Sequence, residues 1–234
     1  MMTMLYFLQK NKRWLLPLLA FGLIAPFTPF LDLTIAHYFY DQGGGRWEPL
    51  LSHPALSFCF QYGPIPGQII AIAALLAFFS SYLFPHCKSW RPHALVLVLT
   101  LVVGAGVISY AVFKSHWGRP RPRQVIQFGG QQEFRPFYQP NFFQQPEPSK
   151  SFPSGHCTMG FYFFAVVFLG MRLRNKAIFY LGLLFTIFLG LALSFTRMAQ
   201  GGHFFSDVIT SALIMWLTAL IIDQVIYERL KGKI

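Results

Sequence analysis

The sequence predicts an all-α membrane protein whose single domain, residues 1–234, crosses the bilayer as a bundle of six helices. Of the 234 residues, 54% are hydrophobic and only 12% are charged, whereas roughly 25% of the residues of a soluble domain carry a charge. Six apolar stretches, most of them near the ~20 residues that a helix needs to cross a hydrocarbon core, indicate six transmembrane helices. They cover residues 14–31, 65–84, 94–113, 157–171, 177–195 and 208–226.

The first and fourth stretches have irregular ends. Pro17, Pro26 and Pro29 interrupt the first stretch, so we expect its helix to bend or to end early near Asp32. It is too long for a signal-peptide core and no small-x-small cleavage site follows it, so we expect a retained anchor. The fourth stretch is short unless its helix begins at Pro153, which suits a first turn because proline lacks the amide hydrogen that this turn leaves unused.

One long connection, residues 114–152, joins the third and fourth stretches. A loop of this length without secondary structure is usually functional or disordered. Five basic residues favour function here: Arg119, Arg121, Arg123, Arg135 and Lys150. For residues 139–149 a solvated basic loop with aromatic side chains at the membrane interface remains an equal alternative.

Counts of lysine and arginine predict which face of the membrane each connection occupies. With the N-terminus in the cytoplasm, eleven of the 19 basic residues lie on the cytoplasmic side and eight on the other. The excess agrees with the general rule that cytoplasmic connections are the more basic ones, and most of the eight lie in residues 114–152. This orientation places the ends of the third and fifth helices, and the starts of the fourth and sixth, on the non-cytoplasmic face.

The formal charge of +11 is compatible with nucleic acid, anionic lipid or a phosphate-bearing substrate. Nucleic acid is the least favoured partner, because the basic residues are divided between both faces of the membrane and no nucleic-acid-binding motif accompanies them. Asp and Glu total only eight and no Cys/His spacing indicates a metal site, so we expect no metal and no other cofactor. No feature indicates an obligatory protein partner.

The segment between the fifth and sixth stretches contains His203 and Asp207. Their spacing of four residues places both side chains on one face of a helix. A carboxylate that accepts a hydrogen bond from one imidazole nitrogen fixes the tautomer and leaves the other nitrogen free to attack. We therefore interpret His203 as a nucleophile that would form a phosphohistidine. Alone, the pair also fits a structural role in which Asp207 interacts with the helix dipole.

Pro153, Ser154, Gly155 and His156 open the fourth helix. Free backbone amides and the positive end of the helix dipole favour an anion at such a position. Ser154 can donate its hydroxyl and Gly155 its amide to phosphoryl oxygens, while a protonated His156 can give a proton to the leaving alkoxide. The alternative is an ordinary serine N-cap beside an interfacial histidine.

Lys114, Arg119, Arg121 and Arg123 form a dense basic run where the third helix ends. Arginine offers a planar fork that binds two phosphate oxygens together, and lysine offers a compact point charge. The alternative is a patch that binds lipid headgroups without chemistry.

The three segments together supply the parts of a phosphoryl-transfer site on the non-cytoplasmic face. A phosphoryl group in transfer spreads negative charge over three equatorial oxygens, so its catalyst needs clustered cations, amide donors, a nucleophile and an acid. We expect residues 114–207 to form the core of this site, with residues 114–152 as its long loop.

The order and spacing of these segments resemble the signature of the type 2 phosphatidic acid phosphatase superfamily, which includes the vanadium haloperoxidases. That signature is Lys, six residues, Arg-Pro; then Pro-Ser-Gly-His; then Ser-Arg, five residues, His, three residues, Asp. Residues 114–122, 153–156 and 197–207 match it, and Thr196 stands where the family usually has serine. A haloperoxidase is not expected because those relatives are soluble.

The resemblance implies a role for each matched residue. His203 is similar to the family's nucleophile, Asp207 to its orienting partner, and His156 to the acid that protonates the leaving group and later activates water. The matched residues that would bind the phosphoryl oxygens are Lys114, Arg121, Ser154, Gly155 and Arg197.

Three further residues near the motifs fall outside the matched positions. We assign Arg119 and Arg123 to substrate contact or to the membrane interface. His116 is expected to be a polar neighbour of the site rather than a catalytic group.

The resemblance also implies a hydrolase that cleaves a phosphoric monoester or an acid anhydride in a phosphorylated membrane lipid. Residues 116–122, 128–130 and 134–137 resemble bacterial members that dephosphorylate lipid A, which we favour over undecaprenyl-diphosphate and phosphatidylglycerophosphate phosphatases. Lipid phosphotransfer, and anion binding or transport without turnover, remain alternatives. A compact chain of this kind fits the bacterial inner (cytoplasmic) membrane, with the active site facing the periplasm.

Overall fold

Helices form all the regular secondary structure of the computed structural model, which describes residues 2–144 and 147–231. Residues 145 and 146 of the long connection lie outside the described residues. The α-helices are α1 (Met2–Ile24), α2 (Thr28–Gln42), α3 (Glu48–Leu51), α4 (Pro54–Tyr62), α5 (Ile65–Leu83), α6 (Arg91–Leu99), α7 (Gly155–Phe161), α8 (Phe164–Arg172), α9 (Lys176–Ala199) and α10 (Phe205–Lys231). The other helical elements are the 3₁₀ helices η1 (Ala25–Phe27), η2 (Pro85–Trp90), η4 (Pro122–Gln124) and η5 (Ile126–Phe128), and the π-helix η3 (Thr100–Lys114).

Five helical segments in the described part of the chain are long and apolar enough to cross a membrane: Asn11–Gln42, Pro54–Leu83, Pro85–Lys114, Lys176–Ala199 and Phe205–Glu228. The chain is therefore a multi-pass membrane protein. The predicted fourth helix is instead divided into α7 and α8, with 7 and 9 residues. At a rise of about 1.5 Å per residue, neither piece alone approaches the ~30 Å of a hydrocarbon core.

The first helix does not end near Asp32. It is interrupted at η1 and then continues as α2 to Gln42, so that Asp32 lies inside α2. Pro26 and Pro29 are the second residues of η1 and α2, within a first turn, where a missing amide hydrogen costs no helical hydrogen bond. The prolines therefore bend the span and restart it rather than terminating it.

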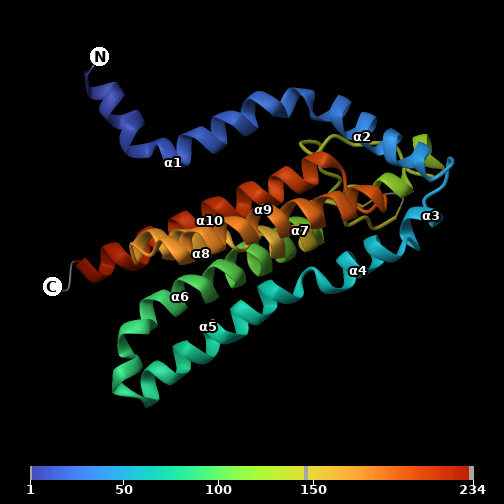
Figure 1. The fold of residues 1–234 in the computed structure, drawn as a ribbon. Helices are drawn as coiled ribbons and strands as arrows, with labels where there is room; N and C mark the ends of the chain where they lie inside the picture. Colours follow the sequence, from blue (N-terminus) through green and yellow to red (C-terminus); the bar gives the residue numbers. More distant parts are fainter. Residues whose placement is uncertain (1, 145–146, 232–234) are drawn as a thin grey trace.

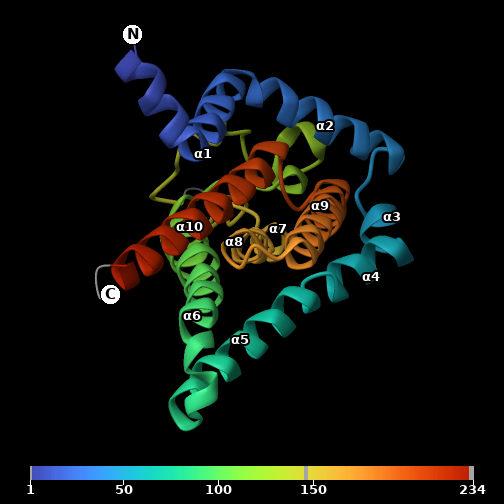
Figure 2. The same cartoon turned by 60° about the vertical axis from the view of Figure 1, so that its left-hand side comes forward.

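In the bundle, α8, α9 and α10 lie between α1–α2 on one side and the α5–α6 hairpin on the other (Figures 1 and 2). The α7–α9 contact is close, because a Cβ on Gly160 would lie 2.8 Å from the Cα of Gly190. The turn after α7 and the helices α8 and α10 share one buried apolar cluster: Tyr162, Ala165, Phe168, Met215, Ala219 and Leu220.

The long connection folds against one end of the bundle, the right-hand end in Figure 1, where α9 ends and α10 begins. Val125 and Phe128 are buried there with Trp47 and Phe204. The indole nitrogen of Trp117 donates a 2.7 Å hydrogen bond to the Phe137 carbonyl within the connection. These residues of the loop are thus packed into the protein.

The alternative of a solvated loop fits only some of the side chains between residues 139 and 149. Phe142 and Phe143 are 60% and 88% exposed, as expected of aromatic residues at a membrane interface. Ser149 is buried and donates a 2.9 Å hydrogen bond to Gln132.

Candidate active site

The three predicted segments meet around one cavity of about 460 Å³ at this end of the bundle. Six of the eight predicted site residues line it: Lys114, Arg121, Gly155, His156, Arg197 and His203. Its remaining walls are mostly apolar and come from α4, α5, η3 and α7: Phe60, Pro64, Gln68, Tyr110 and Met159. Ser154 and Asp207 are fully buried beside the cavity and are not among its lining residues.

His203 and Asp207 face each other where α9 turns into α10. The Nδ1 atom of His203 lies 3.5 Å from the Oδ2 atom of Asp207, and both side chains are almost completely buried. The turn requires glycine at Gly201, whose φ is +58° and whose Cβ would lie 2.6 Å from the Trp47 ring. At this distance Nδ1 has no hydrogen-bond partner among the described residues. A proton on Nδ1 would face the acceptor oxygen of Asp207 and leave the lone pair on Nε2.

The protonation state of His203 suits a nucleophile. Burial lowers the pKa of His203, Asp207 opposes the shift, and the nearby charges of Lys114 and Arg197 add to it, so that the pKa is about 3. The ring is therefore neutral at neutral pH, and a neutral imidazole is the nucleophilic form.

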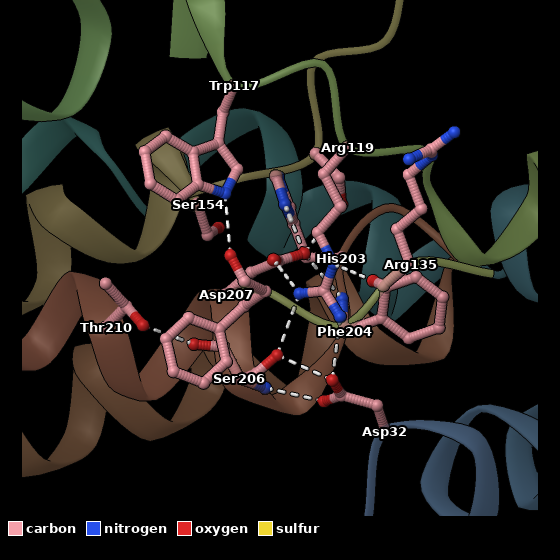
Figure 3. Close-up of polar contacts among 12 residues, drawn as sticks. Asp32, Trp117, Arg119, Arg135, Ser154, His203, Phe204, Ser206, Asp207 and Thr210 are labelled. Atoms are coloured by element: carbon pink, nitrogen blue, oxygen red, sulfur yellow. Dashed lines mark hydrogen bonds and ion pairs between the residues drawn. The ribbon is translucent and has the colours of Figure 1, made fainter. Parts of the chain in front are cut away.

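Three donors hold the Asp207 carboxylate in place (Figure 3). Its Oδ2 atom accepts hydrogen bonds from the Ser151 hydroxyl at 2.6 Å and from the Phe204 amide at 2.8 Å. Its Oδ1 atom accepts a 2.5 Å ion-paired hydrogen bond from Nη1 of Arg119. Such a carboxylate has few alternative orientations, so it fixes the imidazole in turn.

Arg119 is not at the membrane interface, nor does it line the cavity, which corrects its assignment from sequence. Its side chain is fully buried, and besides Asp207 it donates hydrogen bonds to the Arg135 carbonyl, the Ser206 hydroxyl and Asp32. The sequence shows four basic residues in ten positions without separating an inward-facing arginine from its neighbours. The contact with Asp32, 87 residues away along the chain, has no local signal.

Arg197 and Lys114 bring positive charge to the cavity. Nη1 of Arg197 donates a 2.8 Å hydrogen bond to Gln200, while its buried Nε has no hydrogen-bond partner among the described residues. Gly202 leaves room for this guanidinium, since a Cβ there would lie 2.1 Å from Nη2. A Cβ on Gly155 would lie 3.6 Å from Nζ of Lys114, so the lysine faces the start of α7.

Arg121 completes the cluster of cations. Burial and the neighbouring charge of Arg123 lower the pKa of Arg121, as expected for a partly buried cation beside a like charge. Arg123 itself is exposed and lies outside the cavity lining. An anion with several oxygens would relieve the repulsion among these side chains.

Ser154 and His156 occupy different surroundings at the start of α7. Ser154 is in the N-cap position but makes no side-chain cap hydrogen bond, and its amide donates to the Ser211 hydroxyl at 2.9 Å. His156 lines the cavity and stacks on Phe60, with 4.4 Å between the ring centroids. Phe60 belongs to α4, outside all three motifs, and sequence reasoning did not identify it.

His116 lies close to the site in sequence but outside it in space. Its side chain is exposed, its Nδ1 atom lies 3.1 Å from the Val112 carbonyl, and it does not line the cavity.

Comparisons with known proteins agree with this geometry. The family model of the PAP2 superfamily matches residues 94–231. A protein of Francisella tularensis subsp. novicida (strain U112) named lipid A 4'-phosphatase is 30% identical over 86% of this chain and 88% of its own length. A lipid A 4'-phosphatase of Rhizobium leguminosarum is 31% identical over 53% of this chain and 48% of its own length. No solved structure matches the chain significantly.

The family model spans more than half of the chain and contains every matched segment, from Lys114 to Asp207. The chain belongs to the PAP2 superfamily and is a phosphatase-superfamily enzyme.

Proposed function

We propose that this protein removes a phosphate from lipid A, at the 4' position, by metal-independent catalysis through a phosphohistidine. The observation that carries the mechanism is the pairing of two histidines on one cation-lined cavity, one of them fixed by a buried carboxylate. The names of the two bacterial relatives support the substrate. Undecaprenyl diphosphate and phosphatidylglycerophosphate are the alternative substrates.

In the first step, the Nε2 lone pair of His203 attacks phosphorus and the bond from phosphorus to the sugar oxygen breaks. His156 gives its proton to that departing oxygen. Asp207 stabilises the positive charge that develops on the imidazole. The phosphoryl oxygens are held by Lys114, Arg121, Arg197 and the amides at the start of α7, including that of Gly155; Ser154 supports this segment.

In the second step, His156 takes a proton from water, and the water oxygen attacks the phosphorus of the phosphohistidine. The bond from phosphorus to Nε2 breaks and its electron pair returns to His203. Inorganic phosphate leaves, and both histidines regain their starting protonation states. His156 takes part in both proton transfers, as the donor in the first step and as the acceptor in the second.

We infer that α7 and α8 together make the sixth crossing of the membrane. Residues 155–172 would span about 27 Å if nearly collinear, close to the thickness of a hydrocarbon core. The cavity then opens on the non-cytoplasmic side of a bacterial inner membrane. Its apolar walls, including Phe60, Tyr110 and Met159, suit a substrate whose acyl chains stay in the bilayer.

Phosphate release by the purified protein in detergent with EDTA tests the proposal. The substrates are lipid A, undecaprenyl diphosphate, phosphatidylglycerophosphate and phosphatidic acid, and mass spectrometry locates the phosphate lost from lipid A. His203→Ala should abolish release, whereas His116→Ala should retain it because His116 is exposed and outside the cavity. Release that requires a divalent metal, or that persists in His203→Ala, would contradict the mechanism.

The same panel separates hydrolysis from phosphotransfer. Hydrolysis yields one inorganic phosphate for each lipid dephosphorylated. A transferase would dephosphorylate lipid A without releasing phosphate and would yield a newly phosphorylated acceptor lipid.

A further inference from the structure

Asp32 contacts the catalytic end of the bundle although it lies far from all three motifs along the sequence. It belongs to α2 and precedes the residues 94–231 that the family model matches. Its side chain is fully buried, and its Oδ2 atom accepts a 2.7 Å hydrogen bond from Nη2 of Arg119. A carboxylate removed completely from water is costly unless charged and hydrogen-bonded partners compensate it.

The same carboxylate also binds the first turn of α10. The Ser206 amide donates to Oδ1 of Asp32 at 2.7 Å, and the Ser206 hydroxyl donates to Oδ2 at 2.6 Å. The first turn of a helix has amide groups without helical partners. Asp32 therefore caps α10 from a different helix, next to the residue that faces His203.

Arg119 connects the two carboxylates (Figure 3). Nη2 donates to Asp32, while Nη1 donates to Asp207 at 2.5 Å and to the Ser206 hydroxyl at 2.7 Å. The guanidinium is planar and its donors point in fixed directions, so the position of Asp32 sets the direction from which Arg119 approaches Asp207.

The charges of this assembly, like its geometry, favour the reaction. Asp32, Arg119 and Asp207 are each fully buried. The groups that bond to Asp32 are all donors, as an ionised carboxylate requires, so two carboxylates with one guanidinium leave one net negative charge. His203 becomes positive as its Nε2 atom bonds to phosphorus. A fixed negative charge in a water-excluded site stabilises that transition state more than the resting state.

We propose that Asp32 is a positioning residue for phosphoryl transfer, acting through Arg119 on Asp207. This inference rests on the proposed role of His203 as the nucleophile. Asp32 does not line the cavity, so its removal should impair the chemical step without weakening the binding of the phosphate group.

Asp32→Asn is the informative variant because it keeps the size of the side chain but removes its charge. An amide presents a donor in place of one acceptor oxygen, so it cannot satisfy both Arg119 and the Ser206 amide. We expect kcat to fall by about 10- to 100-fold, the scale of a small misplacement of catalytic groups, with KM within about twofold of wild type. Asp41→Asn is the matched control, because Asp41 lies on the same helix with a 60% exposed side chain, and it should keep wild-type kcat.

Two inhibitors separate positioning from a purely structural role. Vanadate bound to His203 mimics five-coordinate phosphorus, whereas inorganic phosphate reports only ground-state binding to the cations. In Asp32→Asn, the inhibition constant of vanadate should rise by about the same factor by which kcat falls. The inhibition constant of phosphate should stay unchanged. An equal weakening of both inhibitors would show a general disturbance of the cavity and overturn the proposal.

Folding is checked by size-exclusion chromatography and thermal unfolding in detergent. If Asp32→Asn does not fold, Ser206→Ala replaces it, because it deletes only the hydroxyl between Asp32 and Arg119. We then expect kcat to fall about fivefold, the effect of one hydrogen bond. A folded variant with wild-type kcat and vanadate inhibition overturns the inference alone. A wild-type protein that neither releases phosphate nor binds vanadate overturns the proposed function, and this inference with it.

Discussion

The imidazole ring of His156 lies almost parallel to the phenyl ring of Phe60, with 4.4 Å between the ring centroids and 19° between the planes. The guanidinium carbon of Arg197 lies 4.7 Å from the centroid of the same ring. One side chain of α4 therefore supports both the proposed acid and one of the proposed phosphate ligands. The rest of α4 contributes no polar group to the cavity lining.

Phe60→Ala should reduce kcat/KM by about tenfold, because stacking and cation–π contacts each contribute roughly 0.5–1.5 kcal/mol. Phe60 is 37% exposed, so the fold should persist. Steady-state phosphate release checks the prediction, with Phe58→Ala as the control because Phe58 is on the same helix and 66% exposed. Equal activities of the two variants would contradict a role for Phe60.

Gly202→Ala should displace the Arg197 guanidinium, because the added Cβ would lie 2.1 Å from Nη2. Loss of a hydrogen bond to a charged group costs about 1.5–3 kcal/mol, so the inhibition constant of inorganic phosphate should rise by roughly 10- to 100-fold. Gly22→Ala provides the control, since a Cβ there meets nothing within 4 Å. Unchanged phosphate inhibition in Gly202→Ala would argue against Arg197 as a phosphate ligand.

The pKa of His203, lowered by burial to about 3, predicts that its ring stays neutral down to about pH 4. ¹⁵N NMR of histidine-labelled protein in micelles measures this directly, and subtraction of the His203→Ala spectrum identifies the resonance. Because the folded pKa is below the ~6.5 of an unfolded histidine, His203 also makes folding less favourable as the pH falls below that value. Titration of His203 near pH 6.5 would contradict the prediction.

The orientation of the chain predicts that the long loop faces the periplasm. In a variant with Cys59, Cys87 and Cys157 replaced by alanine, Phe143→Cys should react with a membrane-impermeant maleimide in intact cells, because Phe143 is 88% exposed. Lys176→Cys, exposed at the start of α9, should react only after lysis. The reverse pattern would place the active site in the cytoplasm. Phosphate release confirms that both variants are folded.

Local patterns predicted the helical class and six of the residues that line the cavity. Apolar stretches near ~20 residues identify membrane helices because hydrocarbon cannot hydrogen-bond to the backbone. His203 and Asp207 do lie within 3.5 Å of each other, but the prediction that they share one helical face was wrong. The helix α10 begins at Phe205, so His203 belongs to the turn before it, and that turn brings its ring to Asp207. The same patterns did not predict the division into α7 and α8, or the continuation of the first span through η1 to Gln42.

The sequence by itself determined the family and predicted which groups carry the proposed chemistry, since the motif residues are contiguous or regularly spaced along the chain. Only the tertiary structure decided what supports them. The Asp32–Arg119–Asp207 assembly and the Phe60–His156 stack join α2 and α4 to motifs far away in sequence. Burial also distinguished Arg119 from its exposed neighbour Arg123. Contacts between distant segments arise from packing of the whole bundle, and neither propensity nor spacing encodes them.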